Sequence, residues 1–296
     1  MNTLTPLSER EPDNMIDVPS MLTGIILGDP RQEYLAELLA ERGIPSVRIE
    51  QPDREALSSC SVIIAPTPFT RDQKTLYGHP EISVAQFLSW LAPGQLLFGG
   101  NLPWQVTESA RKNGILSYDF MGIEEVAVKN AAATAEGAIA EAIKASPVNL
   151  EGSPCLLAGY GRCGRVLARK LNGLGARVTV CEKEETTRIL AEKESFPSMK
   201  PEELSVFLDK HPVLFLFNTI PCPLFGEPLL QKMPAEVTII DIASAPGGTD
   251  FDYCKKSGRT ALLCPGLPGR YSPKTSAEIL CDAFLSIQRQ RSGGSH

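Results

Sequence analysis

The stretch from Cys155 to Lys170 constrains the fold of this chain more than any other. A short apolar run, Cys155–Ala158, predicts a buried strand, and three glycines with the spacing G-x-G-x-x-G follow it. Gly159 permits a tight turn, Gly161 lets the backbone approach a pyrophosphate, and Gly164 lets the following helix pack on the strand. The N-terminus of that helix would present unpaired N–H groups and its positive dipole end to the phosphates. Strand, glycine turn and helix in this order predict a dinucleotide-binding unit.

The residues after this helix strengthen the prediction. Arg177–Cys181 is expected to form the next strand, and Glu182 follows it about twenty residues beyond the glycines, where an acid can hold a ribose hydroxyl. An acid there favours NAD, whereas Lys183 and Arg188 would offset a 2′-phosphate and favour NADP. The cofactor contacts expected from this unit are Gly159, Tyr160, Gly161, Arg162, Cys163, Gly164, Glu182 and Lys183.

Apolar strands continue to alternate with helices as far as Cys264, which predicts a doubly wound parallel sheet. Ligands of such sheets bind beyond the carboxyl ends of the strands. Asn218, Thr219 and Ser244 follow two of these strands, and we expect them to contact the cofactor. The alternative for Asn218 is a turn that uses the side chain for its own backbone bonds.

The N-terminal part forms a second α/β unit, with strands expected at 23–27, 46–49 and 61–65 and a helix at 32–42. It has one glycine where a dinucleotide fingerprint needs three, so we interpret it as a substrate or cap domain. The predicted organisation, in order along the chain, is a flexible leader (1–20), the N-terminal α/β domain (21–130), a linking helix (131–150), the dinucleotide-binding domain (151–270), a closing helix (271–290) and a disordered tail (291–296).

Composition excludes several classes of function. A net charge of −6 argues against nucleic acid, and no apolar run approaches the roughly 20 residues needed to cross a bilayer. The eight cysteines form no C-x-x-C pair, which is typical of a reducing cytoplasm. The three histidines lack metal-ligand spacing, so no metal site is expected. His79 is expected in a solvated loop, which leaves no evident histidine base for a hydroxyacid dehydrogenase.

Several motifs together resemble one family, the A subunit of dipicolinate synthase, from about residue 21 to residue 288. They are Gly28-Asp29 with Arg31, Asn130 with Thr134-Ala-Glu-Gly137, the glycine fingerprint, Asn218-Thr-x-Pro221, Asp241-x-Ala-Ser244 with Pro246-Gly-Gly-Thr-Asp-Phe251, and Pro265-Gly-Leu-Pro-Gly269 with Pro273-Lys-Thr275. The resemblance implies two Rossmann-like domains, in the architecture of the formate/glycerate dehydrogenases. It also implies oxidation of dihydrodipicolinate to dipicolinate with NADP, or alternatively NAD, in the mother-cell cytoplasm of a sporulating bacterium. The implied partner is a flavoprotein-like B subunit of dipicolinate synthase, and a homo-oligomer is left open.

The implied substrate carries two carboxylates, which need cations or helix N-termini. Lys274 is the first candidate for this role, with Thr275, Thr134 and Arg31 beside it and Arg270 as a further base. Glu136 is a candidate proton acceptor, with an ordinary helix acid as the alternative. Asn130 completes the catalytic candidates. Two other functions stay open: another NAD(P)-dependent two-domain dehydrogenase, and a non-catalytic subunit that only binds dinucleotide.

Overall fold

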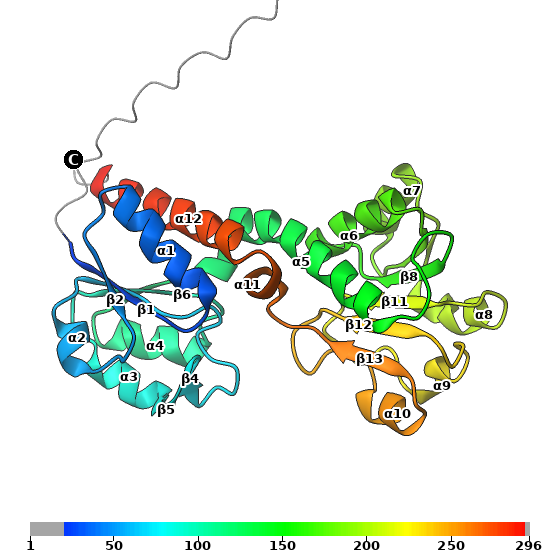
Figure 1. Cartoon of the computed structure of the whole chain (residues 1–296), viewed down its shortest axis with the longest axis horizontal. Coiled ribbons are helices and arrows are strands. Elements are labelled where there is room, and N and C mark those ends of the chain that lie inside the picture. The colour runs from blue at the N-terminus through cyan, green and yellow to red at the C-terminus, as the bar shows by residue number, and fades with distance from the viewer. Residues whose placement is uncertain (1–20, 294–296) are drawn as a thin grey trace, which may run out of the picture.

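The computed structural model describes residues 21–293 and shows two α/β domains joined by long helices (Figure 1). The predicted leader 1–20 and the end of the predicted tail lie outside the described residues. Residues 291–293, which were expected in the tail, continue the last helix instead. The expected fold class, two Rossmann-like domains with parallel sheets, is confirmed.

The first domain is built on a five-stranded parallel sheet with the order β2-β1-β3-β6-β7. Its strands are β1 (Thr23–Ile26), β2 (Ser46–Ile49), β3 (Val62–Ile64), β6 (Leu96–Gly99) and β7 (Leu116–Asp119). Its helices are α1 (Pro30–Glu41), α2 (Arg54–Ser58), α3 (Val84–Trp90) and α4 (Trp104–Lys112), and a small hairpin comprises β4 (Thr75–Leu76) and β5 (His79–Ser83). From β1 the chain adds β2 on one side of the sheet and then β3, β6 and β7 on the other. In flavodoxin-like sheets, ligands bind at this switch point, which here lies between β1 and β3.

The second domain has a six-stranded parallel sheet with the order β10-β9-β8-β11-β12-β13. Its strands are β8 (Pro154–Ala158), β9 (Arg177–Cys181), β10 (Ser198–Met199), β11 (Phe215–Asn218), β12 (Thr238–Asp241) and β13 (Thr260–Leu263). Its helices are α6 (Arg162–Gly173), α7 (Glu185–Lys193), α8 (Leu204–Leu208), α9 (Glu227–Leu230) and α10 (Phe251–Lys256). This is the strand order of dinucleotide-binding sheets, and its switch point lies between β8 and β11.

Two helices connect the domains, and a third returns to the first domain. Helix α5 (Glu124–Ala145) runs from the first domain to the second, so the linking helix begins seven residues before the expected Ala131. The short α11 (Leu267–Tyr271) lies between the domains, and α12 (Pro273–Gly293) then returns to pack along α1. Ala277, Leu280 and Phe284 of α12 belong to the same core as β1 and β6. The C-terminal helix is therefore a structural part of the first domain.

Two short segments differ from their expected structure for reasons of tertiary packing. His79, expected in a solvated loop, begins β5 and is only 7% exposed, because its Nε2 lies 2.6 Å from the carbonyl oxygen of Leu27. Residues 116–119, for which the sequence predicted no strand, form the edge strand β7, whose Tyr118 ring stacks on Phe98 at 4.8 Å. A partner from elsewhere in the chain supplies the stabilising contact in both cases.

Candidate functional site

The glycine fingerprint occupies the turn between β8 and α6, at the switch point of the second sheet. Gly159 has a φ of +89°, and a Cβ on it would lie 2.1 Å from the Thr219 hydroxyl oxygen. A Cβ on Gly164 would lie 2.2 Å from the carbonyl oxygen of Gly159. Both positions therefore admit no side chain, because turn, helix and neighbouring strand are in direct contact.

Gly161 is different, because a Cβ built on it would meet no atom within 4 Å. It is the N-cap of α6, and no side chain caps this helix end. The first N–H groups of α6 thus remain available at an open surface, together with the positive end of the helix dipole. This open cradle fits the pyrophosphate of a dinucleotide.

Glu182 lies at the carboxyl end of β9, at the position that an adenosine ribose would approach. Its carboxylate accepts hydrogen bonds from the backbone N–H groups of Tyr160, at 2.8 Å, and Glu184, at 3.1 Å. Arg188 was expected to offset a 2′-phosphate, but it is 9% exposed and donates to the carbonyl oxygens of Glu182 and Lys183. Arg188 therefore pairs with the carbonyl groups after β9. Of the two bases expected to offset a 2′-phosphate, only Lys183 is exposed.

Tyr160, Arg162 and Cys163, the residues between the glycines, were expected to contact the cofactor, but their side chains contact other parts of the protein. The Tyr160 side chain is buried, its hydroxyl lies 2.9 Å from a carboxylate oxygen of Glu194, and burial raises its pKa to about 12. Only the Tyr160 backbone can therefore face a cofactor. Arg162 forms an ion pair of 2.7 Å with Glu124 of α5, and burial raises the pKa of the Cys163 thiol beside Thr134. The first turn of α6 is thus held against the linking helix.

The expectation that Asn218 contacts the cofactor is corrected by its surroundings. Asn218 is fully buried, and its amide nitrogen donates to Ile220 O at 3.0 Å and to an Asp241 carboxylate oxygen at 2.9 Å. Its side-chain oxygen accepts from Ile220 N. The same Asp241 oxygen accepts from Gly248 N and the Thr249 hydroxyl. Asn218 and Asp241 therefore fasten the two loops together and leave no polar atom for a ligand.

Thr219 and Ser244 remain at the surface of this edge. The Thr219 hydroxyl donates to Ala158 O at 2.9 Å, which places it directly under the fingerprint turn and leaves its oxygen as an acceptor. Ser244 is exposed in the loop after β12, and only its backbone carbonyl is engaged, by Gly247 N. Both can still line the nicotinamide half of a dinucleotide site.

Two of the basic residues expected to bind substrate are already paired within the protein. Arg31 is 5% exposed, pairs with Asp29 and donates to the carbonyl oxygen of Thr67. Arg270 pairs with the buried Glu141 of α5. Arg31 does reach the second half of the chain, since a Cβ on Gly269 would lie 2.7 Å from its Nε. Both arginines thus hold together the elements around α11; Arg31 is buried there, whereas the Arg270 side chain is half exposed.

The expected acid–base candidates are also separated. Glu136, expected to accept a proton, is exposed and forms an ion pair of 2.8 Å with Lys170 at the far end of α6, so that expectation is corrected. Asn130 is buried, and its side-chain oxygen accepts from the Ser276 hydroxyl at 3.2 Å, which ties α5 to α12. Lys274 and Thr275 are exposed at the start of α12.

Arg71, a cation at the junction between the domains, was not among the residues that the sequence predicted for the site. Arg71 lies in the loop after β3, with its guanidinium 4.4 Å from the centre of the Tyr77 ring. A Cβ on Gly266 of the second domain would lie 3.7 Å from Arg71 Nη2. The sequence does contain a signal that could have pointed to Arg71. The run Pro66-Thr-Pro68 ends a predicted strand, so the residues after it form a loop at the ligand edge of the first sheet.

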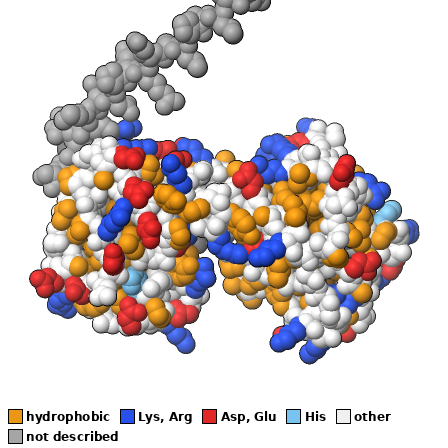
Figure 2. All heavy atoms as spheres, viewed as in Figure 1, with side chains coloured by type: hydrophobic (Ala, Val, Ile, Leu, Met, Phe, Trp, Pro, Cys, Tyr) orange, Lys and Arg blue, Asp and Glu red, His pale blue; other side chains and the backbone are white. Residues whose placement is uncertain are grey.

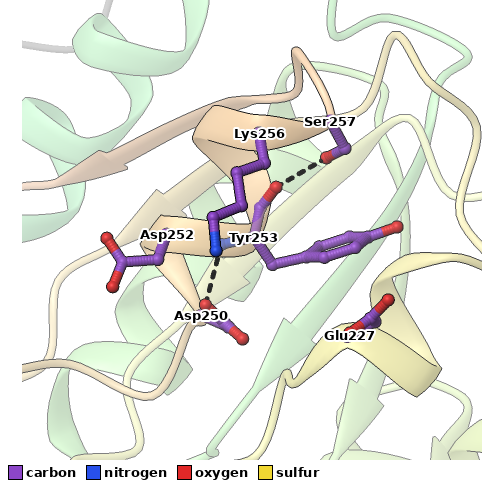
Figure 3. A pocket seen from close by; sticks show the side chains of 6 residues that line it. All are labelled: Glu227, Asp250, Asp252, Tyr253, Lys256 and Ser257. Atoms are coloured by element: carbon purple, nitrogen blue, oxygen red, sulfur yellow. Dashed lines mark hydrogen bonds between the residues drawn. The ribbon is translucent and has the colours of Figure 1, made fainter.

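A distinct pocket on the second domain does not suit the same ligand (Figure 3). It is lined by Glu227 of α9 and by Asp250, Asp252, Tyr253, Lys256 and Ser257 around α10. Carboxylates make up half of these side chains, so the pocket would repel the phosphates of a dinucleotide. The glycine fingerprint is therefore the better candidate for a cofactor site.

Residues 21–293 contain no cluster of three or more His, Cys, Asp or Glu side chains arranged to hold a metal ion. Within the same range, no helix is long and apolar enough to span a membrane.

Known proteins resemble this chain in sequence and in fold. Residues 23–121 match the profile of the N-terminal domain of the dipicolinate synthase A subunit. The corresponding A subunit of Bacillus subtilis is 35% identical over 164 residues, which are 55% of this chain and 54% of that protein. The aligned sequence thus spans about half the length of this relative.

Solved structures extend the likeness to both domains. The dipicolinate synthase A subunit from Bacillus halodurans superposes with a TM-score of 0.80 at 26% identity, covering 92% of this chain and 98% of the other. An L-alanine dehydrogenase superposes with a TM-score of 0.63 at 13% identity over 93% and 91% of the two chains, which shows a shared fold. The expected resemblance to the A-subunit family of dipicolinate synthase is confirmed.

Proposed function

Taking the relationship to the A-subunit family of dipicolinate synthase as the premise, we propose that this chain oxidises dihydrodipicolinate to dipicolinate. The single observation that carries an oxidoreductase function is the open cradle at Gly161, beside the uncapped N-terminus of α6 at the switch point of the second sheet. A nicotinamide dinucleotide held there supplies the hydride acceptor. The substrate loses one hydride and one proton, and its ring becomes an aromatic pyridine.

This reaction does not need a tuned histidine base. Loss of the proton completes an aromatic ring, so water can take it without a strong base. The residues already paired at the junction, Arg31 with Asp29 and Arg270 with Glu141, keep the surrounding loops in place during the reaction. Lys274 remains our candidate for one substrate carboxylate, because it is exposed at the start of α12 and has no acidic partner among residues 21–292.

We infer that NAD is the preferred dinucleotide. The family resemblance implied NADP, and Lys183 and Arg188 were the two bases that could offset a 2′-phosphate. Arg188, however, is buried and donates to backbone carbonyl oxygens. Glu182 is held at the ribose position by two backbone N–H groups, and its charge would repel a 2′-phosphate. Lys183 alone would have to offset that repulsion.

The test is direct. Purified chain is mixed with dihydrodipicolinate and either NAD or NADP, and the absorbance of the reduced nicotinamide is followed with and without the B subunit. Substrate-dependent reduction of the dinucleotide supports the proposal. Dinucleotide binding without reduction, even with the B subunit present, would instead identify a non-catalytic binding protein. If the dinucleotide is reduced in the presence of other hydroxyacids or of amino acids, but not in the presence of dihydrodipicolinate, the chain is a different dehydrogenase.

The biological setting follows from the same premise. We propose that the chain acts with a flavoprotein-like B subunit, in the mother-cell cytoplasm of a sporulating bacterium. Co-purification of the two proteins from sporulating cells tests this partnership, and a chain that elutes alone at the same activity would contradict it.

A further inference from the structure

The segment between β3 and β5 forms an arm at the ligand edge of the first domain, and hydrogen bonds anchor it at both ends. Its first part is anchored by the Phe69 backbone, whose N–H donates to Gly100 O at 2.7 Å. Its return is anchored by His79, which lies 2.6 Å from Leu27 O at the end of β1. Tyr77 N donates to Phe69 O, which joins the two halves. The arm is therefore fixed to β1 and β6 on either side of the switch point.

Asp72 fixes the tip of this arm. Its carboxylate accepts hydrogen bonds from the hydroxyls of Thr70 and Thr75 and from the backbone N–H groups of Lys74 and Thr75. These bonds hold the pKa of Asp72 far below its ordinary value, with the Thr75 N–H as the largest cause. The carboxylate adjacent to Arg71 in the sequence is therefore fully used in shaping the turn.

Arg71 projects from this tip into the junction between the domains. Its guanidinium lies over the Tyr77 ring at 4.4 Å, which orients the flat group and limits its motion. Its Nη2 approaches Gly266, which follows β13 at the carboxyl edge of the second sheet. On the face shown in Figure 2, Lys and Arg side chains gather where the two domains meet. Arg71 thus stands between the ligand edges of both sheets.

The guanidinium has no acidic partner within residues 21–292. Arg31, Arg162 and Arg270 around the same junction each pair with a carboxylate, whereas Arg71 makes no hydrogen bond or ion pair with the described residues. An oriented guanidinium without a carboxylate offers a planar fork that matches a carboxylate ligand in a bidentate arrangement.

From these observations we propose that Arg71 binds one carboxylate of the substrate and holds it against the nicotinamide half of the second domain. The inference rests on the proposed function, because it takes a dicarboxylate as the ligand. Tyr77 acts as the positioning residue, because its ring stacks against the guanidinium and orients it. Specificity for a dicarboxylate then comes from the first domain, while the second domain provides the dinucleotide site.

The test compares Arg71→Met with Arg71→Lys and a matched control. Arg48→Met removes the same charge from an exposed arginine of the same domain, on β2. Each protein is saturated with NAD, and binding of dipicolinate and of the monocarboxylate picolinate is measured by calorimetry. We expect Arg71→Met to weaken dipicolinate binding about 10- to 100-fold, as for loss of a charge-assisted bidentate contact. Arg71→Lys should recover only part of this loss.

The two ligands separate a direct contact from a general disturbance. Arg71→Met should reduce the advantage of dipicolinate over picolinate, while NAD affinity and the melting temperature stay as in Arg48→Met. Equal dipicolinate affinity in Arg71→Met and Arg48→Met would overturn the inference, and so would a parallel loss of NAD affinity in Arg71→Met. Failure of the unaltered protein to oxidise dihydrodipicolinate, with dipicolinate binding still dependent on Arg71, would overturn the proposed function alone.

Discussion

Replacing Gly161 by valine tests the cofactor site most sharply, because the structure separates its effect on binding from its effect on folding. A Cβ at this position meets no atom within 4 Å, so the first atom of the valine side chain clashes with nothing in the fold. The cost to folding is limited to a poorer N-cap on α6, about 0.5–1 kcal/mol of unfolding free energy. The variant should therefore fold normally.

The effect on binding should be far larger. Phosphate oxygens that accept from backbone N–H groups must approach to about 2.9 Å, and the valine side chain fills the space through which they pass. Loss of two charge-assisted bonds of about 1.5 kcal/mol each removes about 3 kcal/mol of binding free energy. This corresponds to a rise of more than about 100-fold in the dissociation constant for NAD.

Calorimetric titration with NAD, together with thermal unfolding, measures both effects. Gly164→Val is the matched control, because a Cβ there would lie 2.2 Å from Gly159 O, so the same substitution should damage the fold instead. Gly161→Val with the native melting temperature and an NAD affinity within threefold of the unaltered protein would refute the assignment of this turn to the pyrophosphate.

Three further predictions address the cofactor choice, the substrate and the stability of the second domain. Glu182→Gln keeps the acceptor for Tyr160 N but removes the charge, so the preference for NAD over NADP should fall by about tenfold, or roughly 1.4 kcal/mol, in paired titrations; an unchanged ratio would show that Glu182 does not face the ribose. Lys274→Ala should lower kcat/KM for dihydrodipicolinate by about one to two orders of magnitude with unchanged NAD affinity; loss of NAD affinity instead would place Lys274 in the cofactor pocket. Hydrogen bonds from Arg169, Arg165 and Tyr160 lower the pKa of Glu194 to about 2, so its stabilising effect is present above the ordinary pKa of a glutamate and is lost as the pH falls toward 2. Glu194→Gln should thus unfold about 1 kcal/mol more easily at neutral pH and match the unaltered protein near pH 2, which denaturant titrations at both pH values would check.

The sequence by itself determined the strand, glycine turn and helix that open the second domain. Strand, glycine turn and helix are contiguous there, and each glycine answers a local requirement of backbone geometry or close packing. Gly159 needs a positive φ, Gly164 lies against the turn, and Gly161 stays open, as the spacing predicted. The parallel sheet of the second domain could be predicted for the same reason, because uninterrupted apolar runs such as 213–217 suit strands covered on both faces.

Tertiary structure alone decided which polar side chains are free and where the last helix packs. Asn218 and Arg31 have residue types that suit a binding site, yet both already have partners within the protein. Asn218 donates to Asp241, and Arg31 pairs with Asp29 and donates to the carbonyl oxygen of Thr67. Asp241 is the last residue of β12, and Thr67 lies in the loop after β3. These distant partners meet Asn218 and Arg31 only when the sheet edges assemble. Helix α12 likewise returns to the first domain because its apolar face completes the core over β1 and β6. Availability for a ligand depends on what remains unpaired after folding, and a linear pattern does not contain that information.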